Sequence, residues 1–153
     1  MKMSNDKVVQ IGSKGKEIIT GGVVDSSSAS LCFYAEDLDP DEITKILGVN
    51  ATRSIKRGDR RNSVAKPYKK GAWIYRVEGN APSGPNEHLI NLLNSFSVKT
   101  EIWEQLRKKY ECRISIGIHI YGWNRGFTLS PKALTQVNNT GIELDFDIYA
   151  DDE

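Results

Sequence analysis

Hydrophobic and polar residues alternate along two stretches of the chain, 112–121 and 142–149. A period of two places successive side chains on opposite faces of a β-strand, so each stretch predicts a strand with one buried face and one polar face. Strands of this kind are typical of antiparallel or mixed sheets, because strands covered on both faces are apolar throughout. The side chains predicted to face the core are Cys112, Ile114, Ile116, Ile118 and Ile120 in the first stretch and Ile142, Leu144, Phe146 and Ile148 in the second.

Two more strands are predicted over residues 30–36 and 71–78. Each is a short run of apolar and aromatic residues bounded by polar or turn-forming segments. Between 50 and 70 lies a long polar loop, which is unusual inside a compact domain unless it has a function or is mobile. The residues that suggest the two strands are Leu31, Phe33 and Ala35 in the first and Trp73, Tyr75 and Val77 in the second.

The same helix-start pattern occurs in two segments of the chain. A residue able to cap a helix, Asp39 or Ser130, precedes a proline at the first helical position, where the missing N–H costs no hydrogen bond. A glycine, Gly48 or Gly141, then provides the left-handed conformation that ends a helix. A helical region is also predicted around 89–96 and another from Thr100, from the spacing of Leu89, Leu92, Leu93 and Phe96 and from acidic residues followed by basic ones.

These elements predict an α+β fold, in which helices cover one face of a mixed or antiparallel sheet in a two-layer sandwich. Two strand–helix–strand halves are expected, on a ferredoxin-like plan with extra helix between them. Residues 29–153 are expected to form this single domain. Residues 1–28 are rich in Gly, Ser and Lys and are expected to form a flexible arm, with one weak hairpin through Val8–Ile11 and Glu17–Thr20.

Charge is segregated along the chain although the net charge is only +1. Residues 53–70 contain eight basic residues and one acid, Asp59. Residues 36–42 contain five acidic residues and no base, and residues 143–153 contain six acidic residues and no base. Separated fields of this kind can select a partner even when the total charge is near zero.

Composition limits the class of protein. No apolar run approaches the roughly 20 residues that span a bilayer, and no apolar segment follows Lys2 and Lys7, so neither a membrane span nor a secretory signal is expected. The two cysteines, Cys32 and Cys112, lie in predicted strands and are interpreted as buried free thiols, which indicates a cytoplasmic protein. No cofactor and no metal site is expected.

Several short motifs follow one another along the chain. They are the helix signature 38–48, Lys56-Arg57-Gly58-Asp59, Gly71 with Trp73, Phe127-Thr128-Leu129-Ser130, and the terminal segment 144–149. In the order and spacing of these motifs, residues 30–149 resemble bacterial proteins of the domain of unknown function 4279 family. Members of that family occur in toxin, immunity and defence settings, so the resemblance implies a binding role, and it supplies no catalytic residues.

The polar face of the last predicted strand is the first candidate site. Alternate positions place its carboxylates on one face, about 7 Å apart along the strand. We predict an acidic surface that binds a basic partner, although a solvated face that resists edge pairing has the same pattern. Arg113 and His119 are expected among these acids if the strand 112–121 lies alongside, and a metal site at His119 is not favoured. The candidate partner-binding residues are Glu143, Asp145, Asp147, Tyr149, Tyr121 and Trp123.

The basic loop 53–70 is the second candidate site. Clustered Arg and Lys neutralise phosphates, which suggests a nucleic-acid contact through Arg57, Arg60, Arg61 and Lys66. The same loop has an alternative role as the intramolecular partner of the acidic segment 37–42. Tyr68 and Trp73 lie near enough in sequence to stack on bases, but no nucleic-acid-binding signature is present.

The favoured function is that of a small cytoplasmic, non-enzymatic binding protein, of an immunity or defence type, that neutralises a toxin or effector by protein–protein contact. The alternative is a nucleic-acid-binding module that uses the basic loop. Enzymatic chemistry has little support, because no Ser/His/acid set and no glycine-rich phosphate loop can be recognised.

Overall fold

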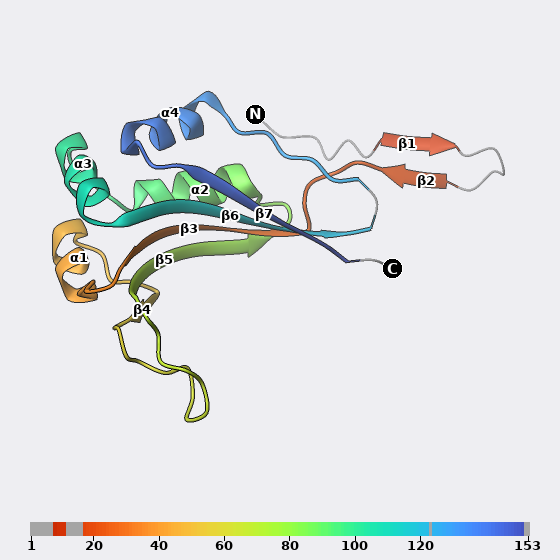
Figure 1. The fold of residues 1–153 in the computed structure, drawn as a ribbon. Coiled ribbons are helices and arrows are strands. Elements are labelled where there is room, and N and C mark those ends of the chain that lie inside the picture. Colours follow the sequence, from red (N-terminus) through yellow and green to blue (C-terminus); the bar gives the residue numbers. More distant parts are fainter. Residues whose placement is uncertain (1–7, 12–16, 123, 152–153) are drawn as a thin grey trace.

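The computed structural model describes residues 8–11, 17–122 and 124–151. In these ranges the chain forms strands and helices in an alternating order, shown in Figure 1. The elements are β1 (Val8–Ile11), β2 (Glu17–Thr20), β3 (Ser26–Ala35), α1 (Pro40–Leu47), β4 (Arg53–Ile55), β5 (Gly71–Asn80), α2 (Pro85–Asn94), α3 (Thr100–Lys109), β6 (Glu111–Tyr121), α4 (Pro131–Thr140) and β7 (Leu144–Asp151).

The main sheet has five strands in the order β4-β5-β3-β6-β7. Strand β3 lies in the middle and pairs antiparallel with β5 on one side and with β6 on the other. Strand β7 pairs parallel with β6, and α4 makes the crossover between them. The sheet is therefore mixed, and the two strand–helix–strand halves differ in strand direction: β3–α1–β5 joins antiparallel neighbours, whereas β6–α4–β7 joins parallel ones.

The helices cover one face of this sheet, which confirms the predicted α+β sandwich (Figure 1). The apolar side chains of β3, β5 and β6 on that face pack against the apolar sides of the helices in one continuous core. Phe33, Trp73 and Ile116 are fully buried there, and Leu89 of α2 is fully buried above them. Each such side chain contributes roughly 1.5–3 kcal/mol relative to an exposed position, so this layer is the main source of stability.

The two proline-initiated helices begin and end as predicted. The Asp39 carboxylate accepts a hydrogen bond from the Asp41 N–H at the start of α1, and the Ser130 hydroxyl accepts one from the Ala133 N–H at the start of α4. Both helices end at a glycine in the left-handed conformation, with φ of 71° at Gly48 and 63° at Gly141.

Three elements differ from the sequence-based expectations. Strand β3 begins at Ser26, four residues before the predicted start at Ser30. The expected loop contains the short strand β4, which pairs with β5. Phe146 and Ile148 of β7 were expected in the core but are 41% and 61% exposed, because β7 is an edge strand and extends past the helical layer (Figure 1).

The predicted hairpin is confirmed, since β1 and β2 pair antiparallel and form a separate two-stranded sheet. The remaining residues of the expected arm, 1–7 and 12–16, lie outside the described part of the chain. Both cysteines are free thiols: Cys32 is buried and Cys112 is half-buried. Burial raises the pKa of both, that of Cys112 to about 11, so neither is a ready nucleophile.

One buried polar pair lies in the helix-covered layer. His88 of α2 is 4% exposed, and its Nδ1 lies 2.8 Å from the hydroxyl of Ser27, which is 3% exposed. Burial lowers the pKa of His88 below its ordinary value, so the ring stays neutral near pH 7. The ring packs against Gly79, where an added Cβ would lie 2.9 Å from Nε2. This pair ties β3 to α2 in the interior.

Gly71 provides a test of how tightly the first half is packed. A Cβ added at this position would lie 2.7 Å from the Leu38 carbonyl oxygen, which is backbone and cannot rotate away. We expect Gly71→Ala to destabilise the chain by about 1–3 kcal/mol in urea unfolding, as overpacking does. Gly126→Ala is the control, because no atom lies within 4 Å of the added Cβ there. Equal stability of the two variants would contradict the close contact.

Candidate binding face

The sheet has a second face that no helix covers among the described residues, here called the open face (Figure 1). It displays the residues that alternate with the core positions of each strand, and the strand register aligns them in rows. One row contains Arg76, Ser30, Ser115 and Asp145; the next contains Glu78, Ser28, Gly117 and Asp147; a third contains Asn80, Ser26, His119 and Tyr149.

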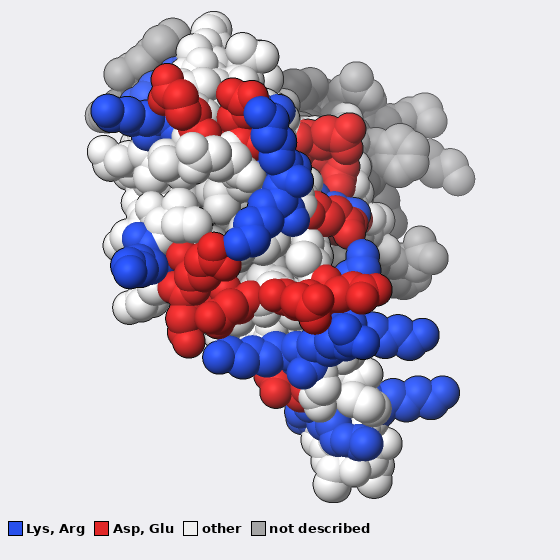
Figure 2. Space-filling model, turned by 60° about the vertical axis from the view of Figure 1, so that its left-hand side comes forward, with Lys and Arg blue, Asp and Glu red and all other residues white. Residues whose placement is uncertain are grey.

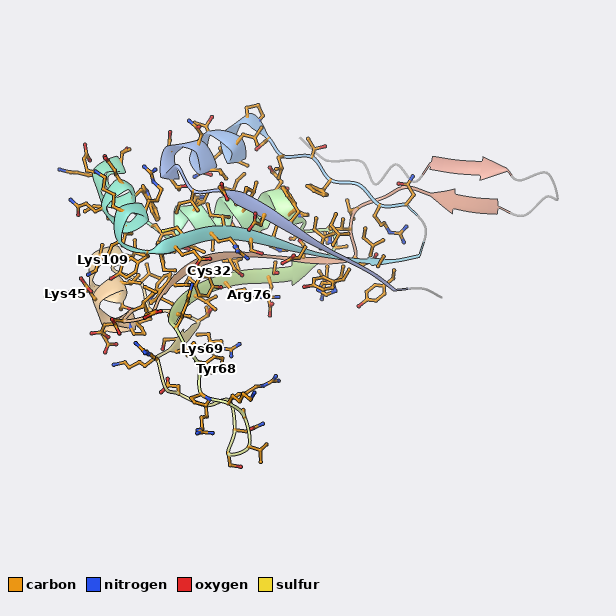
Figure 3. All side chains as sticks on the ribbon, viewed as in Figure 1. Cys32, Lys45, Tyr68, Lys69, Arg76 and Lys109 are labelled. Atoms are coloured by element: carbon orange, nitrogen blue, oxygen red, sulfur yellow. The ribbon has the colours of Figure 1, made fainter. Side chains whose placement is uncertain are left out.

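The middle of the open face is hollow because its residues are small. Ser28 and Ser30 of β3 lie opposite Gly117 and Ser115 of β6, and longer side chains stand on either side. Two adjoining hollows of about 210 and 300 Å³ share Ser28, Arg76 and His119 among their lining residues. We call this feature the serine trough, with Ser26, Ser28, Ser30, Ser115 and Gly117 as its floor. Figure 3 shows Arg76 on the side of the sheet away from the helices.

The trough floor is deep and polar. Ser28 and Ser30 are only 4% and 7% exposed, yet neither hydroxyl has a hydrogen-bond partner among the described residues. Gly117 allows Ser28 to lie this deep, because a Cβ added at Gly117 would be 2.8 Å from the Ser28 hydroxyl. Hydroxyls that line an open hollow and have no protein partner are satisfied by water or by a ligand. The floor is therefore suited to receive polar groups.

Charged side chains border the trough on both sides. On the β5 side, Arg76 donates to Glu78 at 2.7 Å. On the β7 side, Arg113 and Asp145 form an ion pair at 2.9 Å, which confirms the expected cross-strand pairing. Asp147 accepts a long hydrogen bond of 3.5 Å from Ser115 and forms no ion pair with the described residues. Exposed ion pairs stabilise by at most about 1 kcal/mol, so these groups can exchange partners readily.

His119 stacks on Tyr149, with ring centroids 4.9 Å apart and an interplanar angle of 14°. The pair forms a flat aromatic end to the trough, and Tyr149 is 54% exposed. Within the described ranges, no group of three or more His, Cys, Asp or Glu side chains is placed to hold a metal ion. His119 therefore contributes a ring surface to this face.

The structure brings together most of the predicted partner-binding residues. Asp145, Asp147 and Tyr149 lie side by side on the open face, and Tyr121 continues the same face of β6 with 54% exposure. Glu143 is exposed directly before β7, where its carbonyl accepts a hydrogen bond from the Ile114 N–H. Trp123 lies outside the described residues.

Sequence reasoning did not identify the trough itself. Residues 26–29 have no apolar alternation, so the sequence predicts a strand only from Ser30. A single basic residue in a strand, such as Arg76, gives no pattern that predicts a site. The sequence signal for the trough is a set of small residues at alternate positions, Ser26, Ser28 and Ser30 in β3 and Ser115 and Gly117 in β6, and its meaning depends on the pairing of β3 with β6.

The basic loop contacts the acidic start of α1, as the intramolecular alternative predicted. Lys56 lies 3.6 Å from Asp39 and 3.5 Å from Asp41, and Arg57 lies 3.4 Å from Asp37. The charges of Asp39 and then Asp41 raise the pKa of Lys56. Acidic and basic bands alternate at this end of the molecule in Figure 2.

The other loop residues have different surroundings. Arg60 donates to the Ala65 carbonyl at 2.8 Å within the loop, and the Asp59 carboxylate accepts from the Lys56 N–H at 2.7 Å. Arg61 and Lys66 are exposed, with no ion pair to the described residues. The acidic segment also forms an ion pair with α3. Lys109 lies 2.6 Å from Glu42 and lowers the pKa of that carboxyl group.

Comparison with known proteins identifies one relationship. No curated protein and no solved structure was found to match the chain. Among the described residues, no helix has the length and apolar content that crossing a membrane requires. The family model described as "Domain of unknown function (DUF4279)" matches residues 25–151, which include the whole five-stranded sheet and all four helices. The chain belongs to the DUF4279 family.

Proposed function

We propose that this chain is a binding protein that holds a partner protein on the open face of its sheet. The observation that carries the proposal is Asp147, a carboxylate at the rim of the serine trough that forms no ion pair with a cation of the described residues. A basic side chain of the partner supplies that cation. The trough hydroxyls, Tyr149 and Tyr121 surround it with hydrogen-bonding and aromatic groups, which are common at protein interfaces.

The sheet geometry supports this proposal in a second way. Exposed acids alone also occur on solvated faces, but a solvated face does not require a hollow floor made of two serines that are 4% and 7% exposed. The hollow lies between taller charged walls and accepts a protruding side chain. Interfaces of this form place a central anchor in a pocket within a polar rim.

The proposed setting is the cytoplasm, and the proposed partner is a toxin or effector whose functional surface is basic. The two free thiols are consistent with a reducing compartment. The toxin or effector identity rests on the settings in which family members occur. A nuclease is one class of effector with a basic functional surface, because its substrate is a polyanion.

A matched pair of charge reversals tests the proposed function. Tagged chains are expressed in the native host, cross-linked and purified, and the captured protein is identified by mass spectrometry. We expect one stoichiometric partner with the wild type and at least about ten-fold less of it with Asp147→Lys, since like charges repel across an interface. Glu101→Lys, on the exposed side of α3, is the control and should capture as much partner as the wild type. Recovery of the wild-type chain alone, or equal capture by both variants, would contradict the proposal.

A nucleic-acid contact through the basic loop is the second candidate. The observation in its favour is that Arg61 and Lys66 are exposed without an acidic partner in the described ranges. Against it, Lys56 and Arg57 are already neutralised by the start of α1. The loop therefore has fewer available cations than its sequence suggests.

Salt dependence tests the second candidate. Fluorescence anisotropy with a labelled single-stranded oligonucleotide would show affinity that falls steeply between 50 and 200 mM salt, roughly ten-fold or more for a few phosphate contacts. Arg60→Glu with Arg61→Glu should abolish the binding, whereas Lys132→Glu on α4 should leave it unchanged. Weak binding with a flat salt response would exclude this function.

A further inference from the structure

Strand β7 forms an unusual edge of the sheet. Among the described residues, β6 is the only strand that pairs with it, so one side of β7 has no strand neighbour. The opposite edge is made by β4, which has only three residues, and by the part of β5 from Tyr75 to Asn80 with which β4 does not pair. Short edge strands limit unwanted pairing, whereas β7 presents eight residues.

The hydrogen-bond pattern shows which backbone groups are available at this edge. The Ile114 N–H donates to the Glu143 carbonyl at 3.0 Å, and Ile114 lies opposite Leu144 in the parallel pair. In a parallel ladder, alternate residues bond to one neighbour and the residues between them point to the other side. The N–H and C=O groups of Leu144, Phe146, Ile148 and Ala150 therefore point outward from the sheet.

Side chains of two kinds flank this row of backbone groups. On the open face lie Asp145 and Asp147. On the helix side, Phe146 and Ile148 are 41% and 61% exposed, and Phe127 stacks on Phe146 with a centroid distance of 5.9 Å. Acids on an edge strand are a common protection against aggregation. That role does not account for two large apolar side chains left exposed on the same strand.

A second copy of this chain is a poor occupant of the edge. Residues 143–153 contain six acidic residues and no base, so pairing two copies of β7 brings acids together. Like charges directly opposite each other destabilise a strand pair. A strand with basic side chains at alternate positions has the opposite effect, because those side chains meet Asp145 and Asp147.

We propose that β7 is a docking edge at which an extended segment of the partner protein adds a sixth strand to the sheet, with basic side chains on the open face and apolar side chains beside Phe146 and Ile148. This inference rests on the proposed function and specifies how the partner is held. Backbone hydrogen bonds to Phe146 and Ile148 provide affinity, and the alternating side chains provide specificity. Docking at this edge also carries the partner toward Asp147 and the serine trough.

Synthetic peptides test the docking edge directly. Three peptides of equal length are titrated against the isotopically labelled full chain: one alternates Arg and Val, one has the same composition in two blocks, and one alternates Glu and Val. We expect the alternating Arg–Val peptide to bind at least about ten-fold more tightly than the other two. Its binding should slow hydrogen exchange of the Phe146 and Ile148 amides, which point outward in the free chain.

A proline substitution provides the matched variant. Ile148→Pro removes an outward-facing N–H and no hydrogen bond to β6, so the fold should be retained while peptide binding falls at least about ten-fold. Circular dichroism checks the fold of the variant. If this variant fails to fold, hydrogen exchange of the Phe146 and Ile148 amides in the wild-type chain still tests whether the peptide binds at this edge.

The outcomes separate the docking edge from the proposed function. Equal binding of the two Arg–Val peptides, with unchanged exchange at Phe146 and Ile148, would overturn the docking edge while leaving an acidic binding face in place. Absence of binding by every peptide would also overturn it, and the capture experiment with Asp147→Lys would then judge the proposed function alone.

Discussion

The fold depends on burial of only one of the two faces of the main sheet. Leu31, Phe33 and Ile116 are completely buried beneath the helices, and the strands that carry them have no helix on their other side among the described residues. Since packing constrains only the covered face, the alternate positions are free to carry hydroxyl, charged and aromatic groups. The serine trough and its charged rim are the consequence of this one-sided core.

The central position of β3 explains why the open face is hollow. The serines of β3 lie between β5 and β6, and β6 adds Ser115 and Gly117 to the floor, so the longer side chains of β5 on one side and of β7, beyond β6, on the other stand above them. The same serines on an edge strand would be exposed and would form no floor.

The two edges of the sheet also differ. Strand β4 is short and is followed by a loop that contacts α1, whereas β7 is long and carries exposed apolar and acidic side chains. Both features favour the β6–β7 half of the molecule as the location of the proposed binding face.

Elements with strong local signals could be predicted from the sequence. Alternation over 112–121 identifies β6 and its buried isoleucines, and the Asp39 and Ser130 caps locate two helix starts. Features that depend on which strands are neighbours could not be predicted in this way. Ser28 and Ser30 are nearly buried because of β5 and β6, and Phe146 is exposed because β7 is an edge. Strand β4 is too short to show a period, and the Ser27–His88 contact joins residues sixty-one positions apart.

The central claim, that the sheet has one covered face and one open face, is tested most directly by thiol labelling at two neighbouring positions of β6. Ser115 lies on the open face and Ile116 is 0% exposed beneath the helices. In a chain with Cys32→Ala and Cys112→Ala, Ser115→Cys should react with a water-soluble thiol reagent in the native state. Ile116→Cys should react only as fast as the chain unfolds. Equal labelling of the two positions, or faster labelling at 116, would contradict the account.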